Sequence, residues 1–590
     1  MPPVAARVRA AGRAERLRAR LDHWRLALAG SRADLLLALL GLLSGVCAAV
    51  VIVAFRKTVA LVQHVYMAGL PGEAFEWLPV PTRVLVPVAG GVLLGVGFVL
   101  LPSAARTVGV VHVLERLHYH QGYMPWRNML WQFCGAALAL ATGQSVGREA
   151  PSVHLGAGSA SLLGSALALP NNALRTLVAG GAAAAIAASF NTPLAGVVFA
   201  MEVVMAEYTI AGFVPVILAA VAATAITRAV FGDDTAFQVP LFGLANLAEL
   251  AYVVPMGMII GCASASFVAL IRALTRIATP VPVAAQFAVA GTLVGALGWL
   301  RPEILGLGYD TVALTLAGQL GLVTMVAVFT TKFLASAACL AARMPGGLIG
   351  PTVVLGSLAG GCFAHLAALL PGTASAAPFY AMLGMAAMMG AVLQAPLSAL
   401  LALLEMTGNP LIILPGMLAV VTAALTARSL WRQESVFTLL MRDAGLDYRH
   451  DPLSQSLRRI GVGAVMSRSF EQAPRVLSRE QAHSLLRRGP QWIIVDHQPG
   501  QPLLLRASEL ARHCETDVGG EADIDLVAIP AERYELRPVH LQATLYEARE
   551  IMLREGVEAL YVRRQQAPMT FRTFGVLHRA DVEAGYTFGA

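Results

Sequence analysis

The sequence predicts an all-α multi-pass membrane protein with a small α/β domain at its C-terminal end. Of the 590 residues, 57% are hydrophobic and 13% are charged, whereas a soluble globular domain carries roughly 25% charged residues. Apolar stretches fill residues 35–443, and the composition becomes polar after that point. The mean hydropathy is +0.65. We therefore expect residues 35–443 to lie in a lipid bilayer.

The segment before the first apolar stretch, residues 1–34, is rich in arginine and is expected to be cytoplasmic. It holds eight arginines and three acids, and basic flanks mark the cytoplasmic side of a membrane protein. Much of the formal net charge of +7 comes from this segment, so the charge does not indicate nucleic acid binding. The apolar run that follows is long enough to span a bilayer, which argues against a secretory signal.

The apolar region divides into stretches of two kinds. Some are long enough to span a bilayer, which needs about 20 residues: 35–55, 84–101, 213–230 and 253–270. Others are shorter or are interrupted by glycine and proline: 145–165, 173–190, 347–355 and 391–405. Irregular backbone survives inside a membrane only where protein or a water-filled cavity satisfies it. The mixture therefore predicts half-spanning helices around a buried site.

Two copies of one motif lie about 200 residues apart in this region. Residues 147–156 read GREAPSVHLG, and residues 347–356 read GLIGPTVVLG. Paired segments interrupted by glycine and proline, at corresponding places in two halves, point to a membrane transport site. The first copy also places an ionisable residue, Glu149, at membrane depth. Such a residue is costly there and is functional by default.

A second pair of motifs repeats at nearly the same offset. Residues 191–195 read NTPLA and precede Glu202, and residues 394–398 read QAPLS and precede Glu405. In both copies the glutamate lies nine positions after the proline. We therefore expect two related halves, about 35–235 and 245–443. The motifs alone do not say whether the halves run parallel or inverted.

Residues 463–590 are predicted to form a soluble α/β domain after a polar linker, 444–462. Short strand-like runs such as 492–495 and 559–562 alternate with polar helical stretches such as 478–488 and 545–555. No membrane span follows this domain, so it is expected on one side of the membrane. With an even number of crossings before it, the domain shares the cytoplasm with the arginine-rich segment.

The membrane motifs resemble those of the CLC family of chloride channels and proton/chloride exchangers. The matching stretches are GREAP at 147–151, GLIGP at 347–351, FNTPLAG at 190–196 with Glu202, and EMTGN at 405–409. The resemblance covers most of residues 35–443. It implies a CLC-type inverted repeat of tilted and half-spanning helices, assembled as a homodimer with one pore per subunit. It also implies transport of chloride or another small anion in a bacterial inner membrane, with both termini in the cytoplasm.

The resemblance also implies an anion site at helix starts. A helix that begins inside the membrane exposes free N–H groups and about half a positive charge. Glu149 is then the gate: ionised, it fills the place of the anion, and protonated or displaced, it opens the path. The alternative is a structural pair with Arg148. The expected anion-binding positions are Val108, Gly109, Gly147, Arg148, Glu149, Leu348, Ile349 and Phe437.

Three positions depart from the family pattern. Val108 and Phe437 stand where the family has a serine and a tyrosine hydroxyl. Because a hydrogen bond to a charged partner contributes roughly 1.5–3 kcal/mol, their loss should weaken the central anion site. Val203 stands where exchangers carry an inner glutamate that delivers protons, so tight proton coupling by the usual path is not expected. Glu202 belongs to the pattern and is expected to have a structural role.

Two histidines lie near the motifs. His154 follows Glu149 by five residues and could tune the pH response of the gate. A packed polar residue at a helix contact is the plainer interpretation of His154. We expect His112 in a loop or at an interface.

Residues 463–590 resemble a tandem pair of CBS domains, which many CLC proteins carry. Gly575 and Asp581 keep the glycine and the aspartate of the nucleotide-binding copies, and His578 replaces their hydroxyl residue. Binding of an adenine nucleotide with a contact to Asp581 is one alternative. A role in dimer stability or gate coupling without a ligand is favoured.

The favoured function is passive conduction of chloride or a similar small anion through a pore gated by Glu149. One alternative is a proton/chloride antiporter with a non-standard inner proton path. Another is a regulatory scaffold in which the CBS pair senses a ligand. The sequence has no P-loop or other enzyme motif, and its six cysteines lack metal-ligand spacing. We therefore expect no enzymatic activity, no metal and no resident cofactor.

Overall fold

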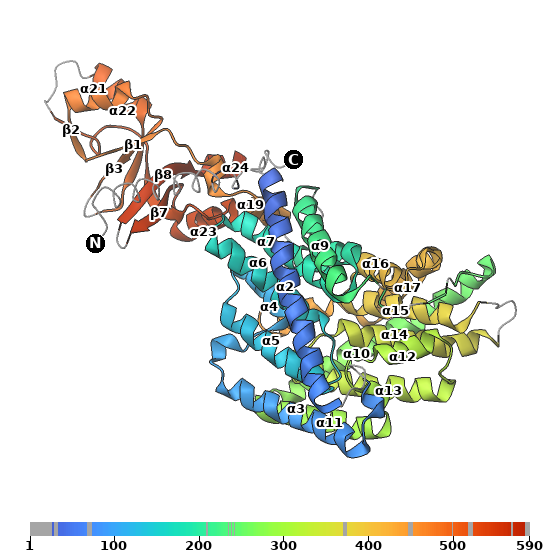
Figure 1. Ribbon diagram of the computed structural model, residues 1–590. Helices are drawn as coiled ribbons and strands as arrows, with labels where there is room; N and C mark the ends of the chain where they lie inside the picture. Colours follow the sequence, from blue (N-terminus) through green and yellow to red (C-terminus); the bar gives the residue numbers. More distant parts are fainter. Residues whose placement is uncertain are drawn as a thin grey trace. The chain divides into compact units, whose positions relative to one another are not determined.

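The computed structural model describes residues 26, 28, 34–67, 74–207, 210–233, 235–237, 239–240, 242–369, 375–446, 452–497, 500–516, 523–567 and 570–584. The chain forms two compact units. The first is helical and comprises residues 38–165 and 175–448; the second comprises 1–37, 166–174 and 449–590 and contains the strands (Figure 1). The arginine-rich segment predicted to be cytoplasmic lies almost entirely outside the described residues.

The helical unit contains two series of helices that follow the same order. The first series is α2 (Asp34–Met67), α3 (Val80–Leu100), α4 (Gly109–Tyr119), α5 (Trp126–Ala141), α6 (Glu149–Ala166), α7 (Asn171–Phe190), α8 (Pro193–Phe199), a π-helical turn (Ala200–Met205) and α9 (Ile210–Phe231). The second series is α10 (Leu250–Ala278), α11 (Val283–Leu300), α12 (Tyr309–Leu316), α13 (Leu322–Ala341), α14 (Ile349–Ala367), α15 (Ala377–Leu393), α16 (Pro396–Thr407) and α17 (Ile413–Trp431), followed by α18 (Val436–Asp443). Two related halves, as the motifs predicted, therefore make up this unit.

This is a multi-pass membrane protein. Within the described ranges, nine helical segments are long and apolar enough to cross a membrane, and α8, α15 and α16 are shorter apolar helices. The prediction that the stretches 173–190 and 347–355 are too short to span was wrong. The first is α7, with 20 residues, and the second is only the start of α14, with 19. Two asparagines extend the first helix, and a stretch rich in glycine and alanine extends the second.

Glycine contacts hold the repeated helices close together. In the first half, a side chain added at Gly156 or Gly181 would clash with the backbone of the other, where α6 packs on α7. In the second half, Gly356 and Gly384 make the same contact between α14 and α15. Small residues let helix backbones approach closely in a membrane, where burial of apolar surface gives little drive for association. The duplicated sequence therefore builds the same helix pair twice.

The second unit contains a six-stranded sheet in the order β1-β3-β4-β6-β7-β8 and a separate pair, β2 with β5. The strands are β1 (Phe470–Ala473), β2 (Val476–Ser478), β3 (Trp492–Val495), β4 (Leu503–Arg506), β5 (Asp523–Asp525), β6 (Arg533–His540), β7 (Ala559–Ala567) and β8 (Thr570–His578). The helices are α19 (Pro452–Arg459), α20 (Val462–Val465), α21 (Arg479–Arg487), α22 (Ala507–Thr516), α23 (Leu545–Glu555) and α24 (Arg579–Ala584).

An internal repeat is visible in this unit. Apart from the short strands β2 and β5, the order β1-α21-β3-β4-α22 is followed by β6-α23-β7-β8-α24. Both β1–β3 and β6–β7 are parallel, whereas β3–β4 and β7–β8 are antiparallel. Capping boxes begin both α21, at Ser478, and α23, at Thr544. The two helices and two strands predicted here are confirmed, although β7 extends five residues further than expected, because its polar end pairs with β8.

Candidate functional site

The two copies of the glycine motif meet through their backbones. The N–H of Gly147 donates to the carbonyl oxygen of Gly347 at 2.7 Å, and the N–H of Gly347 donates back to Gly147 at 2.7 Å. Helix α6 begins two residues after the first glycine, and α14 begins two residues after the second. Proline lies in the first turn of each helix, where its missing N–H costs nothing. Two helix starts with free N–H groups therefore lie side by side.

Glu149 is fully buried between these helix starts. Its Oε1 accepts a hydrogen bond from the Tyr309 hydroxyl at 3.2 Å, and the backbone N–H groups of Glu149 and Gly350 also interact with the carboxylate. Oε2 has no hydrogen-bond partner among the described residues. Side chains added at Gly147, Gly347 or Gly350 would contact or overlap the carboxylate. Three glycines thus leave a cradle at the helix starts, and one carboxylate fills it.

Arg148 lies over two aromatic rings. Its guanidinium lies 5.3 Å from the centre of the Phe190 ring and 5.5 Å from that of Tyr309, which is within the range of cation–π contacts. No ion pair between Arg148 and Glu149 is formed within the part of the chain that the structure describes. The alternative interpretation of Glu149 as a structural partner of Arg148 is therefore not supported.

Tyr309 was missed by the sequence interpretation. Its loop is fixed by the fully buried Lys332, whose Nζ donates to the carbonyl oxygens of Ile304 at 2.9 Å and Gly306 at 2.8 Å. Gly308 precedes Tyr309 with φ of 77°, a left-handed conformation that favours glycine. The sequence did contain a sign of its role. Tyr309 occupies the position in the second half that Gly109 occupies in the first, because the offset between them equals the offset between Gly147 and Gly347.

The corresponding loop of the first half lies at Val108 and Gly109. Its backbone N–H is already hydrogen-bonded within the protein. Val108 is extended and precedes α4, and the N–H of Gly109 donates to Oε1 of the buried Gln132 at 2.7 Å. The Gln132 amide in turn donates to the carbonyl oxygen of Pro345 at 3.1 Å. An anion could bind the Gly109 N–H only if Gln132 turned away. The neighbouring Thr107 hydroxyl accepts a hydrogen bond from the Asn128 amide at 3.3 Å.

The remaining anion-site positions are apolar and buried. Leu348 and Ile349, at the start of α14, are 5% and 8% exposed. Phe437 is 4% exposed on α18, which packs against α4 and α15. The structure thus brings Gly147, Arg148 and Glu149 together with Leu348 and Ile349. Phe437 and Val108 belong to elements in contact with each other, and neither supplies a hydroxyl group.

Glu202 and Glu405 cap each other's helices. The Glu405 carboxylate accepts from the N–H groups of Leu194 at 3.0 Å and Ala195 at 2.8 Å, at the start of α8. The Glu202 carboxylate accepts from the N–H groups of Leu397 at 3.3 Å and Ser398 at 2.8 Å, at the start of α16. Each half therefore caps the start of a helix in the other half, which agrees with a structural role for Glu202.

Val203 follows Glu202 within the π-helical turn and is half-buried. The position where exchangers carry an inner acid therefore holds a side chain that cannot bind a proton. The adjacent acid is already engaged as the cap of α16.

His112 and His154 form a buried pair, with Nδ1 of His112 2.8 Å from Nε2 of His154. The expectation that His112 lies in a loop or at an interface was wrong. It lies inside α4 and is 4% exposed, because the apolar residues Val110, Val113 and Leu117 carry the helix through it. His154 lies on α6, the helix that Glu149 begins.

In the second unit, Asp581 caps its own helix. Its Oδ2 accepts from the N–H of His578 at 2.9 Å. The His578 ring stacks on Trp492, with centroids 5.9 Å apart, and meets the edge of Tyr534 at 4.8 Å. The position that carries a hydroxyl in nucleotide-binding copies is therefore packed among aromatic rings. No cluster of three or more metal-ligating side chains occurs in the described parts of the chain.

Comparisons with known proteins agree with this architecture. The family described as voltage gated chloride channel matches residues 90–428. A Ralstonia nicotianae protein named as a ClcB-like chloride channel protein is 34% identical over 67% of this chain and 94% of its own length. The "H(+)/Cl(-) exchange transporter ClcA" of Salmonella paratyphi B is 28% identical over 72% of this chain and 92% of its own. A crystal structure of a eukaryotic CLC transporter, 18% identical, covers 92% of this chain and 97% of its own with a TM-score of 0.61, and supports the fold.

Proposed function

Since the chain belongs to the voltage gated chloride channel family, we propose that it conducts chloride, or a similar small monovalent anion, passively through a pore that Glu149 closes. The proposal rests on one observation: a fully buried carboxylate lies between the adjacent starts of α6 and α14. The N–H groups at these starts suit a dehydrated anion. Among the described residues no Lys or Arg forms an ion pair with the carboxylate, so a bound anion could leave again, as conduction requires.

The gate works by competition for the same N–H groups. While Glu149 is ionised, its carboxylate interacts with the Gly350 N–H and with the Tyr309 hydroxyl, and an anion cannot enter. Protonation removes the negative charge, so an anion can take the place of the side chain. Flux is therefore expected to rise as the pH falls.

The inner half of the expected proton path lacks a proton-binding side chain, and this favours passive conduction over exchange. Val203 cannot bind a proton, and Glu202 already accepts hydrogen bonds at the start of α16. A proton arriving at Glu149 thus has no acid to receive it at the usual position.

A proton/anion antiporter is the second candidate, and the His112–His154 pair is the observation that favours it. Two imidazoles 2.8 Å apart on α4 and α6 could pass a proton along the helix that Glu149 begins. One relative above is named as an exchange transporter.

Liposomes that contain the purified protein distinguish the two candidates. Chloride efflux and external pH are recorded together, and the reversal potential is measured with and without a pH gradient. We expect chloride efflux without proton movement, and a reversal potential that the pH gradient does not shift. Proton countertransport at a fixed ratio would contradict passive conduction and support the antiporter.

We further propose that residues 463–590 are a CBS pair that regulates the gate. The repeated β-α-β-β-α order supports the pair. Within the same unit, the Asn171 side chain donates to the Glu547 carboxylate at 2.9 and 3.1 Å, and the Asn171 N–H donates to the carbonyl oxygen of Gln542 at 2.9 Å. Asn171 follows α6, so a change in this unit could reach the helix that begins at Glu149. Because His578 and Asp581 have protein partners, regulation without an adenine nucleotide is favoured.

The homodimer, the inner-membrane location and the cytoplasmic position of both termini are part of the same proposal, and they follow from the family and from the arginine-rich start. Fractionation with a reporter fused to each terminus would test the orientation.

A further inference from the structure

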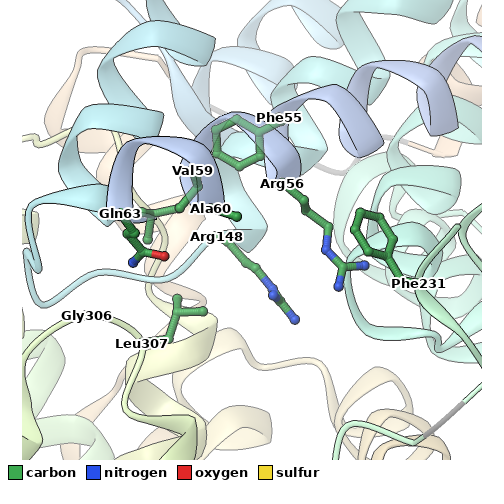
Figure 2. A pocket seen from close by; sticks show the side chains of 10 residues that line it. Phe55, Arg56, Val59, Ala60, Gln63, Arg148, Phe231, Gly306 and Leu307 are labelled. Atoms are coloured by element: carbon green, nitrogen blue, oxygen red, sulfur yellow. The ribbon is translucent and has the colours of Figure 1, made fainter. Parts of the chain in front are cut away.

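The helical unit contains a cavity of about 200 Å3 next to the chain segments that hold the gate (Figure 2). The lining residues are Phe55, Arg56, Val59, Ala60, Gln63, Leu140, Arg148, Phe231, Gly306 and Leu307. Arg148 directly precedes Glu149, and the loop at Gly306 and Leu307 continues to Tyr309. The cavity is therefore lined, from both halves of the protein, by residues close in the chain to Glu149 and Tyr309.

The polar lining is positively charged. It contains two guanidinium groups and the amide of Gln63, and no acid is among the described lining residues. In Figure 2 the side chains of Arg56 and Arg148 reach into the same space from different elements.

Both arginines are held in place by aromatic rings. The Arg56 guanidinium lies 3.8 Å from the centre of the Phe231 ring, and its Nη1 donates to the carbonyl oxygen of Ala188 at 3.3 Å. Arg148 lies over Phe190 and Tyr309. Stacking on a ring orients a guanidinium without cancelling its charge. The Nε of Arg148 is buried without a hydrogen-bond partner among the described residues, which leaves a donor for a ligand.

We propose that this cavity holds a hydrated monovalent anion between Arg56 and Arg148 before the anion reaches Glu149. The inference rests on the proposed function and adds Arg56 as a residue that recruits the anion. A cavity lined by one sign of charge raises the local concentration of the opposite ion and its rate of entry.

The size of the cavity explains why the anion would stay hydrated. A water molecule takes about 30 Å3 of liquid volume, so a cavity of about 200 Å3 has room for an anion with several waters. A pair of guanidinium groups distinguishes poorly between hydrated anions that carry the same charge. The site should therefore select by charge, and size selection is left to the N–H groups around Glu149.

The test uses Glu149→Ala as the parent protein. Without the gate, the rate of anion entry limits the flux at low anion concentration. Arg56→Gln, Arg56→Lys and the control Arg127→Gln are added to this parent; Arg127 also contacts a ring, that of Trp126, but does not line the cavity. Chloride and nitrate currents are recorded in planar bilayers against anion concentration. We expect Arg56→Gln to lower both currents about three- to tenfold at low concentration, with recovery at high concentration and an unchanged chloride-to-nitrate ratio. Arg56→Lys should retain most of the current, and Arg127→Gln should match the parent.

Two results would overturn the inference: a concentration curve for Arg56→Gln that coincides with the parent, or a loss that is equal at all concentrations. Calorimetric titration with bromide tests the same site without flux. The otherwise native protein should bind one more anion than its Arg56→Gln variant, and equal numbers would contradict the proposal. If the parent carries no anion current, the proposed function fails, and the titration still decides whether the cavity binds an anion.

Discussion

The two copies of the glycine motif have nearly the same backbone and differ in one decisive side chain. Gly147 and Gly347 exchange hydrogen bonds of equal length, and each precedes a helix start by two residues. The same glycine contact then packs α6 on α7 and α14 on α15. At the third position, however, one copy carries Glu149 and the other Ile349. A duplicated backbone therefore builds the N–H groups of the site, and only the first copy adds a carboxylate, which we propose is the gate.

The two corresponding loops near this site also differ between the halves. In the first half, Gln132 occupies the N–H of Gly109. In the second half, the counterpart Tyr309 directs its hydroxyl to Glu149. The N–H of the first loop is bonded to a neutral amide, whereas the second loop donates a hydrogen bond to the proposed gate.

The largest effect is expected from removal of the carboxylate that only the first copy carries. Glu149→Ala should give a constant anion leak with no pH dependence, because nothing charged competes for the N–H groups. Anion efflux from liposomes between pH 5 and pH 8 measures it. Ile349→Ala is the matched change in the other copy and should keep the pH dependence. Unchanged pH dependence in Glu149→Ala would refute the gate.

The reciprocal caps should respond equally if the halves are equivalent. Glu202→Gln and Glu405→Gln each weaken hydrogen bonds from two backbone N–H groups to a carboxylate. A hydrogen bond to a charged group contributes roughly 1.5–3 kcal/mol, so each variant should lose stability on that order. Unfolding titrations in detergent measure the loss. If Glu202→Gln kept full stability but changed proton movement, Glu202 would be a proton carrier and not a cap.

Removal of the Tyr309 hydroxyl should loosen the gate without abolishing it. Tyr309→Phe deletes one hydrogen bond to the ionised form of Glu149, so the gate should open at a higher pH. The midpoint of the pH–flux curve is expected to rise by up to about one to two units, since 1.36 kcal/mol corresponds to one unit. Tyr66→Phe is a suitable control, because that hydroxyl donates to the carbonyl oxygen of Ala141. A midpoint that does not move would remove Tyr309 from the gate.

An acid restored at the inner position should not be sufficient for exchange. Val203→Glu alone leaves Phe437 and Val108 without hydroxyl groups at the central site, so we expect no strict coupling of protons to anions. Simultaneous recording of chloride and pH in liposomes gives the ratio. A fixed stoichiometry in this single variant would show that the inner acid is the only missing part.

The smallest effect is expected from the link within the second unit. Asn171→Ala removes the side-chain hydrogen bonds to Glu547 but not the backbone bond to Gln542. We expect a change in flux of about twofold or less at constant pH, with a loss of stability of roughly 1.5–3 kcal/mol, because the part-buried Asn171 amide donates to a charged carboxylate. An equal change in Glu149→Ala/Asn171→Ala would mean that the link does not act through the gate.

Much of the fold was predictable because it is duplicated. The motifs around Glu149, Glu202 and Glu405 fixed the two halves, and the apolar runs located most helices. Contacts between distant segments were not predictable from local pattern. The hydrogen bond from Gln132 to Gly109 and the pairing of His112 with His154 depend on how α4, α5 and α6 pack. Tyr309 stood outside every motif, and only its register with Gly109 indicated its place.

The central claim is that the Glu149 carboxylate and the transported anion compete for one place. An experimental structure of Glu149→Gln with bromide, located by anomalous scattering, tests it most directly. We predict a bromide peak within hydrogen-bond distance of the Gly350 N–H in Glu149→Gln, and none there in the parent protein at neutral pH. A peak of equal occupancy in both proteins, or none in the variant while it still conducts bromide, would contradict the account.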